Sequence, residues 1–209
     1  IRADEPRKIS PFDDMPLLEL MVKTGIASVI DNLPEGIRSS REAVAETIEN
    51  NVRRKIIRDH LNDPAYYERM SALLDEIIEA RRRKAIEYEE YLRQIADLAR
   101  RVQNGQEDNL YEKLQTSGQR ALFNNLKLDR EVEGMTFESS DEPATYSGYQ
   151  DRKLQLALTI DETVKRVKLD GWRGHKPKEQ RIKEALFTLL QNDEDVERLF
   201  DIIYRQPEY

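Results

Sequence analysis

The sequence predicts an all-α fold, an irregular helical bundle organised on one very long helix over about residues 64–104. Three observations support this class. Apolar residues recur every three or four positions in most segments, which is the period of an amphipathic helix. No stretch of useful length alternates apolar and polar residues as a half-buried strand does. Glycine, proline and capping residues separate the helical segments from one another.

The N-terminal part is expected to form three helices. An apolar run over residues 17–22 is closed by Gly25, and residues 26–32 fit a second short helix. Ser39 followed by Glu42 has the spacing of a capping box, so we expect a third helix to begin there and reach about His60. Its apolar face is Val44, Ile48, Val52 and Ile56.

The longest predicted helix runs between Asp63 and Gly105. Asp63 is a good N-cap, Pro64 suits the first helical position, and Gly105 suits the left-handed stop. No glycine or proline lies between Pro64 and Gly105, and roughly 40 residues at 1.5 Å each would span about 60 Å. The apolar seam expected along this helix is Met70, Leu74, Ile77, Tyr88, Leu92, Ile95, Ala99 and Val102.

Positive charge interrupts this seam at its middle. The same register lands on Arg81 and Lys84, within the run Arg81–Lys84. One interpretation is that Arg81 and Lys84 contact a partner. The other is that the charges form i,i+4 pairs, namely Glu79 with Arg83, Arg83 with Glu87 and Glu89 with Arg93, while the stems of Arg81 and Lys84 lie over neighbouring helices. The sequence leaves both interpretations open.

The C-terminal half predicts four further helices around one loop. A capping box of Thr116 and Gln119 opens the first, and residues 131–150 lack helical period and are expected to form an inserted loop. The period returns at Asp151. The remaining signals are breaks at Gly171 and Gly174, a restart at Pro177, and a last helix opened by Asp193 that ends before Pro207. We expect one helical domain over residues 1–209.

Composition excludes several classes of protein. The 34 Lys and Arg residues are outnumbered by 41 Asp and Glu residues, so binding of nucleic acid by bulk charge is not supported. The absence of cysteine removes disulfides and thiolate chemistry and favours a cytoplasmic location. No apolar run is long enough to cross a bilayer. The first residues include no initiator Met, and we expect this chain to be a piece of a longer one.

A search for catalytic motifs finds none. None of the eight glycines precedes a lysine, as a phosphate-binding loop of the Gly-Lys-Ser/Thr kind requires. His60 and His175 are the only histidines, and no Glu-x-Lys follows the pattern of metal-dependent nucleases. We therefore expect no catalytic residue, no metal site and no cofactor within these residues.

One segment has an unusual charge. Residues 165–183 carry eight positive and two negative side chains, and the only tryptophan, Trp172, lies among them. Such a patch could hold nucleic-acid phosphates while the ring stacks, or dock an acidic protein surface. Alternatively, Trp172 fills a core position and the lysines are solvated. The candidate partner- or DNA-binding residues are Trp172, Arg173, Lys176, Lys178, Arg81 and Lys84.

Several segments, in this order, resemble one known protein family. They are EGIRSSREAVAETIENNVRRKII from residue 35, the long segment 63–102, RALFNNL from 120, DGWRGHKPKEQRIKEAL from 170, and the closing QPEY. Together they resemble the C-terminal region of the R (HsdR) subunit of type I restriction-modification enzymes.

This resemblance implies a parent protein that joins a nuclease domain and two helicase-like ATPase domains to a helical C-terminal region. The parent would use ATP and Mg²⁺ to translocate and cleave duplex DNA, and the helical region would attach it to the methyltransferase and specificity subunits. Two hypotheses follow for the function of this chain. In the first it is a non-catalytic docking module. In the second it contacts duplex DNA through the basic patch around Trp172.

Overall fold

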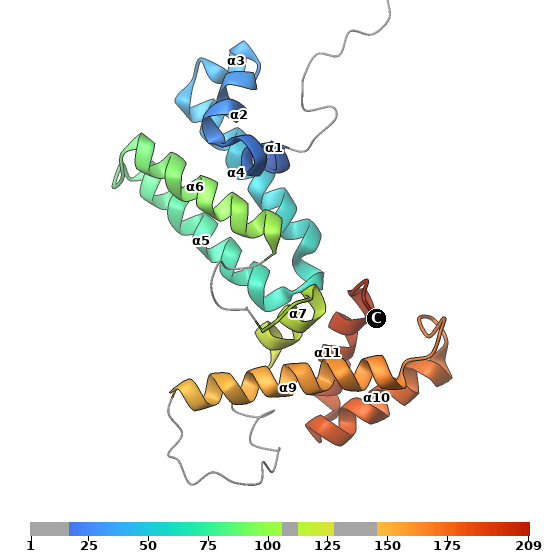
Figure 1. The fold of residues 1–209 in the computed structure, drawn as a ribbon. Coiled ribbons are helices and arrows are strands. Elements are labelled where there is room, and N and C mark those ends of the chain that lie inside the picture. Colours follow the sequence, from blue (N-terminus) through green and yellow to red (C-terminus); the bar gives the residue numbers. More distant parts are fainter. Residues whose placement is uncertain (1–16, 106–112, 128–145) are drawn as a thin grey trace, which may run out of the picture. The chain divides into compact units, whose positions relative to one another are not determined.

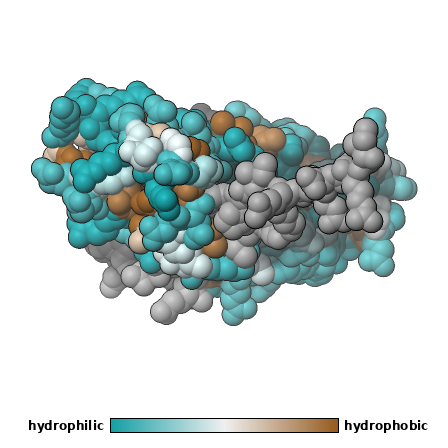
Figure 2. All heavy atoms as spheres, turned by 90° about the horizontal axis from the view of Figure 1, so that it is seen from above, coloured by the Kyte–Doolittle hydropathy of each residue, from teal (hydrophilic) through white to brown (hydrophobic). Residues whose placement is uncertain are grey.

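The computed structural model describes residues 17–105, 113–127 and 146–209, apart from the side chains of 146–149. The regular secondary structure of these residues is helical throughout, with turns and irregular segments between the helices (Figure 1), which confirms the all-α class. None of the described helices combines the length and the apolar character needed to span a membrane. On the face drawn in Figure 2, hydrophilic residues predominate and hydrophobic residues form small groups between them.

The chain divides into two compact units, which are described separately. In the first unit lie α1 (Leu17–Thr24), α2 (Ile26–Asn32), α3 (Glu35–Arg38), α4 (Arg41–Asp59), α5 (Pro64–Arg82) from Tyr67 onward, and α6 (Tyr88–Asn104). The second contains the short 3₁₀ helix η2 (His60–Asn62), α5 as far as Tyr66, α7 (Ser117–Asn125), α9 (Tyr146–Val167), α10 (Lys176–Leu190) and α11 (Asp193–Arg205). The single domain expected over residues 1–209 stays a prediction.

The N-terminal helices follow the local signals, with one shift. Both short helices are present, and Gly25 between them has the positive φ of 86° that glycine tolerates best. The cap of α4 is Ser40, whose hydroxyl accepts a hydrogen bond from the Ala43 amide at 3.3 Å. The capping box predicted on Ser39 and Glu42 is therefore wrong by one residue, because Ser39 instead ends α3.

The single long helix predicted over residues 64–104 is wrong. The two ends of the segment are as expected, since a helix begins at Pro64 and a helix ends at Asn104 with Gly105 as its left-handed C-cap. The Asp63 carboxylate accepts a hydrogen bond from the Tyr66 amide at 3.2 Å. The chain nevertheless leaves the helix after Arg82 and starts α6 at Tyr88. Two helices joined by a short turn replace the expected continuous one.

A C-terminal capping motif built on a lysine causes this break. The Ala85 amide donates to the Ala80 carbonyl at 2.9 Å, and the Lys84 amide donates to the Arg81 carbonyl at 3.0 Å. These two bonds are those of a Schellman motif, which needs a left-handed residue at the position of Lys84. Lys84 adopts this conformation, with φ of 53°. Glycine usually occupies this position, so a lysine there is not recognisable as a helix stop signal.

After the turn, α6 returns beside α5 in the opposite direction (Figure 1). A Cβ built on Gly105, at the end of α6, would lie 3.7 Å from the hydroxyl of Tyr67 near the start of α5. The predicted seam thus folds back on itself. Its members Met70, Leu74, Ile95, Ala99 and Val102 are all buried. They lie in the core of the first unit, where α6 packs against α1 and α4.

The second unit has its own core between α7, α9, α10 and α11. Thr116 and Gln119 form the predicted capping box at the start of α7, which confirms that signal. Gly171 and Gly174 both have positive φ at the predicted break after α9. The expected loop over 131–150 lies mostly outside the described residues, and its last residues, from Tyr146, already belong to α9.

Candidate functional site

Trp172 is a core residue of the second unit. Only 3% of its surface is exposed. Its ring meets Phe200 and Tyr204 of α11 edge to face, with centroids 5.8 and 5.5 Å away. The indole N–H donates to the backbone carbonyl of Tyr209 at 3.2 Å. This position agrees with the alternative in which Trp172 fills the core, and it leaves little of the ring for a ligand to stack on.

Arg173 holds the segment that follows α11. Its guanidinium donates to the backbone carbonyls of Tyr204 at 2.9 Å, Gln206 at 2.6 Å and Tyr209 at 3.2 Å. The guanidinium carbon also lies 4.6 Å from the centre of the Trp172 ring. Both residues chosen from the sequence as partner anchors thus have internal partners in this structure.

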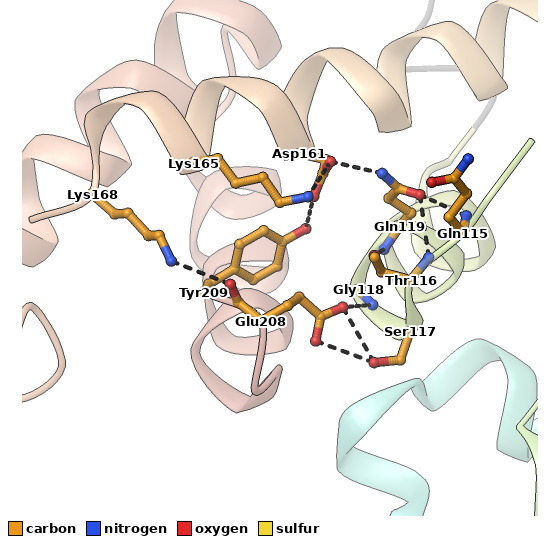
Figure 3. Close-up of polar contacts among 10 residues, drawn as sticks. All are labelled: Gln115, Thr116, Ser117, Gly118, Gln119, Asp161, Lys165, Lys168, Glu208 and Tyr209. Carbon is orange, nitrogen blue, oxygen red and sulfur yellow. Dashed lines mark hydrogen bonds and ion pairs between the residues drawn. The ribbon is translucent and has the colours of Figure 1, made fainter. Parts of the chain in front are cut away.

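Glu208 and Tyr209, which end the sequence, are also held by contacts with α7 and α9 (Figure 3). The Glu208 carboxylate accepts from the amide of Gly118 and from the hydroxyl of Ser117, which lies 3.2 Å away, in the first turn of α7. The partial positive charge at a helix N-terminus stabilises a carboxylate beside it, and the Glu208 carboxylate lies in this position at the start of α7. The Tyr209 hydroxyl donates to Asp161 of α9 at 2.7 Å.

Asp161 is the acceptor on which this contact depends. Its side chain is almost fully buried and also accepts from Gln119 and Lys165, both at 2.8 Å. Burial opposes ionisation, but the hydrogen bonds from Lys165, Gln119 and Tyr209 outweigh it and lower the pKa of Asp161. Burial and the adjacent Asp161 raise the pKa of the Tyr209 phenol. The carboxylate is therefore charged and the phenol protonated at neutral pH.

The other two candidates of the basic segment are placed differently. Lys178 is half-buried and donates to the Asp170 carbonyl at 2.6 Å. Lys176 is exposed at the start of α10, and it has no ion pair or hydrogen bond among the residues that the structure describes. Arg166 and Arg181 are exposed and, within the same residues, equally without partners. These three cations remain available to a ligand.

In the first unit, Arg81 is an internal residue. Its guanidinium donates to Glu49 at 2.9 Å and to Glu42 at 2.7 Å, both in α4. Glu49 also accepts from the hydroxyl of Tyr91 at 3.1 Å. Burial disfavours the charge on Arg81, but the hydrogen bonds to Glu42 and Glu49 prevail and raise its pKa. Arg81 thus ties the end of α5 to α4 and α6.

Lys84, unlike Arg81, is not an internal residue. It is exposed at the tip of the turn, and its side-chain ammonium group is paired with none of the described residues. Of the three predicted i,i+4 pairs, that of Glu79 and Arg83 is present, since the two side chains are 2.5 Å apart and exposed. The other two are absent among the described residues, because Arg83 does not reach Glu87 and Arg93 pairs with Glu90 in place of Glu89. The six candidates therefore divide between the two units, and Lys84 and Lys176 are the two with exposed, unpaired side chains.

A groove on the α5–α6 hairpin was not foreseen from the sequence. It has a volume of about 400 Å³. Its apolar lining is Leu73, Ile77, Ala80, Ile86 and Leu98, and its polar lining is Glu76, Gln94, Asp97 and Arg101. The described residues that line it all come from this hairpin. A single long helix could not have formed the groove, so its prediction required the turn at Lys84.

Two signals in the sequence could have revealed what was missed. The basic run Arg81–Lys84 is followed by Glu87, Glu89 and Glu90, which is the charge order of a helix end followed by a helix start. Asp161 lies between Ile160 and Val164 on the apolar side of its helix, which marks a buried acid in need of donors. Its partner Tyr209 carries no comparable local signal.

The described residues contain no cluster of three or more His, Asp or Glu side chains placed to hold a metal ion. Comparison of the chain with protein-family models, with curated proteins and with solved structures finds no match.

Proposed function

We propose that this chain is a helical docking module of a type I restriction enzyme R subunit. It would attach the ATP-dependent, DNA-translocating endonuclease subunit to the methyltransferase and specificity subunits. The sequence segments quoted above support the family. The observation that supports docking is the groove between α5 and α6, which combines apolar walls with a charged rim on a rigid support.

The support is rigid because a buried ion pair fixes the hairpin. The side chains of Arg81 and Glu49 are only 10% and 7% exposed, and the Tyr91 hydroxyl satisfies the same carboxylate. Breaking such a pair leaves an uncompensated buried charge, which disfavours separation of the end of α5 from α4. A binding surface on rigid helices loses little conformational entropy when a partner docks.

The test is assembly of the proposed complex. The 209-residue chain, immobilised, should retain the assembled methyltransferase and specificity subunits of the same restriction system. The parent R subunit should compete for them, and a parent lacking these residues should not. Full assembly by the truncated parent would contradict the proposal.

A second candidate function is contact with duplex DNA through the second unit. The observation that favours it is the exposure of Arg166, Lys176 and Arg181 without partners among the described residues. Binding through lysine and arginine would weaken steeply with salt, because phosphate contacts release counterions.

The variant for this candidate is the double change Lys176→Ala and Arg181→Ala. It should weaken binding of a random-sequence duplex and reduce the slope of log affinity against log salt by about 2. Arg173→Ala is a poor substitute, since Arg173 supports the backbone after α11. Glu184→Ala, an exposed change in the same helix, is the matched control. An unchanged salt slope in the double variant would exclude this function.

A further inference from the structure

We infer that the groove between α5 and α6 receives a basic amphipathic helix from the methyltransferase side of the complex. This inference rests on the docking function proposed above and adds the chemistry of the partner and its place on this chain. It follows from the shape of the groove, the apolar character of its walls and the charge of its rim.

The groove has the shape that a helix requires. Its walls are two antiparallel helices, and Leu73, Ile77 and Ala80 follow one another along α5 at steps of four and three residues. The distance from Leu73 to Ala80 is about 10 Å at 1.5 Å per residue, or two helical turns. A helix lying in the groove would place apolar side chains at positions i, i+3 or i+4, and i+7 between the walls.

The apolar walls are accessible to such a helix. Leu73, Ile77, Ala80 and Ile86 are only partly buried, whereas Leu74 and Ile78 on the adjoining face are in the core. No described residue outside the hairpin lines the groove. Burial of partly exposed aliphatic side chains favours binding by about 25 cal/mol for each square ångström removed from water.

The acidic side chains on the rim of the groove favour a positively charged partner. Glu76 on the α5 wall is exposed and has no ion pair among the described residues. Among the described residues, the Asp97 side chain on the α6 wall is bound only to Arg100, 2.6 Å away, in a pair of which both side chains are about half exposed. An exposed pair of this kind contributes little, so Asp97 can exchange Arg100 for a partner's cation.

A further acid adjoins the same wall. Glu90 accepts a hydrogen bond at 2.7 Å from Gln94, which lines the groove, and it also forms an ion pair with Arg93, whose side chain is largely exposed. Among the described residues of the lining, Arg101 is the one cation, and it stands toward the end of α6. Lysine or arginine side chains on the two flanks of the incoming helix would therefore face Glu76 and Asp97. An acidic helix would meet like charges on both walls.

The first experiment locates the partner by cross-linking. The photoreactive residue p-benzoylphenylalanine replaces Ile77 in the groove, or Ile57 on α4 as the control, since Ile57 is 69% exposed and outside the groove. Each chain is irradiated with the assembled methyltransferase and specificity subunits. We expect cross-links from position 77 to one helix that carries lysine or arginine beside an apolar stripe, and few from position 57.

The second experiment tests the charges. Glu76→Lys should weaken binding of the same subunits about tenfold at low salt. Glu46→Lys is the matched control, because Glu46 is an exposed acid of α4 without a partner among the described residues. Changing the cross-linked partner lysine to glutamate should restore the affinity of the Glu76→Lys variant. Circular dichroism establishes that both variants are folded.

The outcomes separate this inference from the docking function. Assembly of the complex without a cross-link at position 77 would refute the groove as the binding site and leave the docking function intact. Equal affinity of the subunits for the Glu76→Lys and Glu46→Lys variants would do the same. Failure of the unmodified chain to assemble would overturn docking itself. Cross-links from position 77 to a second copy of this chain, with dimers in sedimentation, would also refute the inference.

Discussion

The hydroxyl of Tyr209 donates to the carboxylate of Asp161 at 2.7 Å, across 48 positions of sequence. This bond fastens the segment after α11 to the C-terminal half of α9. Tyr209→Phe removes the donor and leaves the carboxylate with Gln119 and Lys165. We expect the second unit to lose about 1–2 kcal/mol of unfolding free energy. Hydrogen exchange of the α7 and α9 amides measures this loss, and unchanged protection would contradict the described contact.

The same carboxylate should make stability depend on pH in the acid range. The pKa of Asp161 is lowered below its ordinary value of 3.8 in the folded protein, so folding favours the ionised form. Its contribution is complete at pH values where the unfolded carboxyl is ionised, and it is lost as pH falls through the folded pKa.

Urea unfolding between about pH 7 and pH 3 checks this, with Asp161→Asn for comparison. The difference in unfolding free energy between the two proteins should be constant near neutrality and shrink below the ordinary value of 3.8. A difference that grew on acidification would mean that the pKa is shifted in the opposite direction.

Gly118 is expected to tolerate no side chain. A Cβ at this position would lie 2.7 Å from a carboxylate oxygen of Glu208 and 2.9 Å from the ring of Tyr209. Gly118→Ala should therefore destabilise the second unit by about 1–3 kcal/mol, although alanine normally favours a helix. Thermal unfolding gives the measurement. Gly36→Ala is the control, since a Cβ there meets nothing within 4 Å and should be neutral or stabilising.

Arg81 is expected to be the most sensitive arginine of the first unit. Arg81→Ala leaves Glu49 buried without its cation and should reduce the unfolding free energy by about 3–5 kcal/mol. Arg83→Ala breaks only the exposed pair with Glu79 and should change it by about 0–1 kcal/mol. Urea unfolding compares the two. Equal losses would show that the pair of Arg81 and Glu49 is not buried in solution.

Lys84→Gly distinguishes the hairpin from a straight helix by the sign of its effect. Glycine relieves the strain of a left-handed residue, so in the hairpin we expect a gain of about 0.5 kcal/mol. Within a continuous helix the same change would lose about 1 kcal/mol. Thermal unfolding measures either result. Gln191→Gly, also at a positive φ of 53°, should gain stability similarly, and Arg82→Gly, two residues before Lys84 and still within α5, should lose stability.

The sequence predicted the features that depend on a few adjacent residues. Asp63 with Pro64, Gly105, and the pair of Thr116 and Gln119 each form their own helix end with local hydrogen bonds. Chemistry of this kind is visible in the order of residues. It therefore located most helix boundaries to within one or two positions.

The features that were missed depend on energies that no local pattern records. The positive φ of Lys84 is tolerated because two backbone bonds and the buried contacts of the hairpin offset its strain. Trp172 and Arg173 were interpreted as ligand contacts because their actual partners lie far along the chain. Both side chains bind the segment that ends at Tyr209, which is more than thirty residues away in sequence. Tertiary contacts thus decided both the main correction to the fold and the roles of these two candidates.

The turn at Lys84 also imposes a mirror relation on the sequence around it. Residues at about equal distances on either side of Ile86, within the turn, are brought side by side, as with Tyr67 and Gly105, or Leu73 and Leu98 in the groove. Substitutions in related chains should therefore be coupled in pairs centred on the turn. A one-residue insertion in either helix would rotate every position beyond it by about 100° and separate all of these pairs together. Length changes between Tyr67 and Gly105 should consequently be confined to the turn.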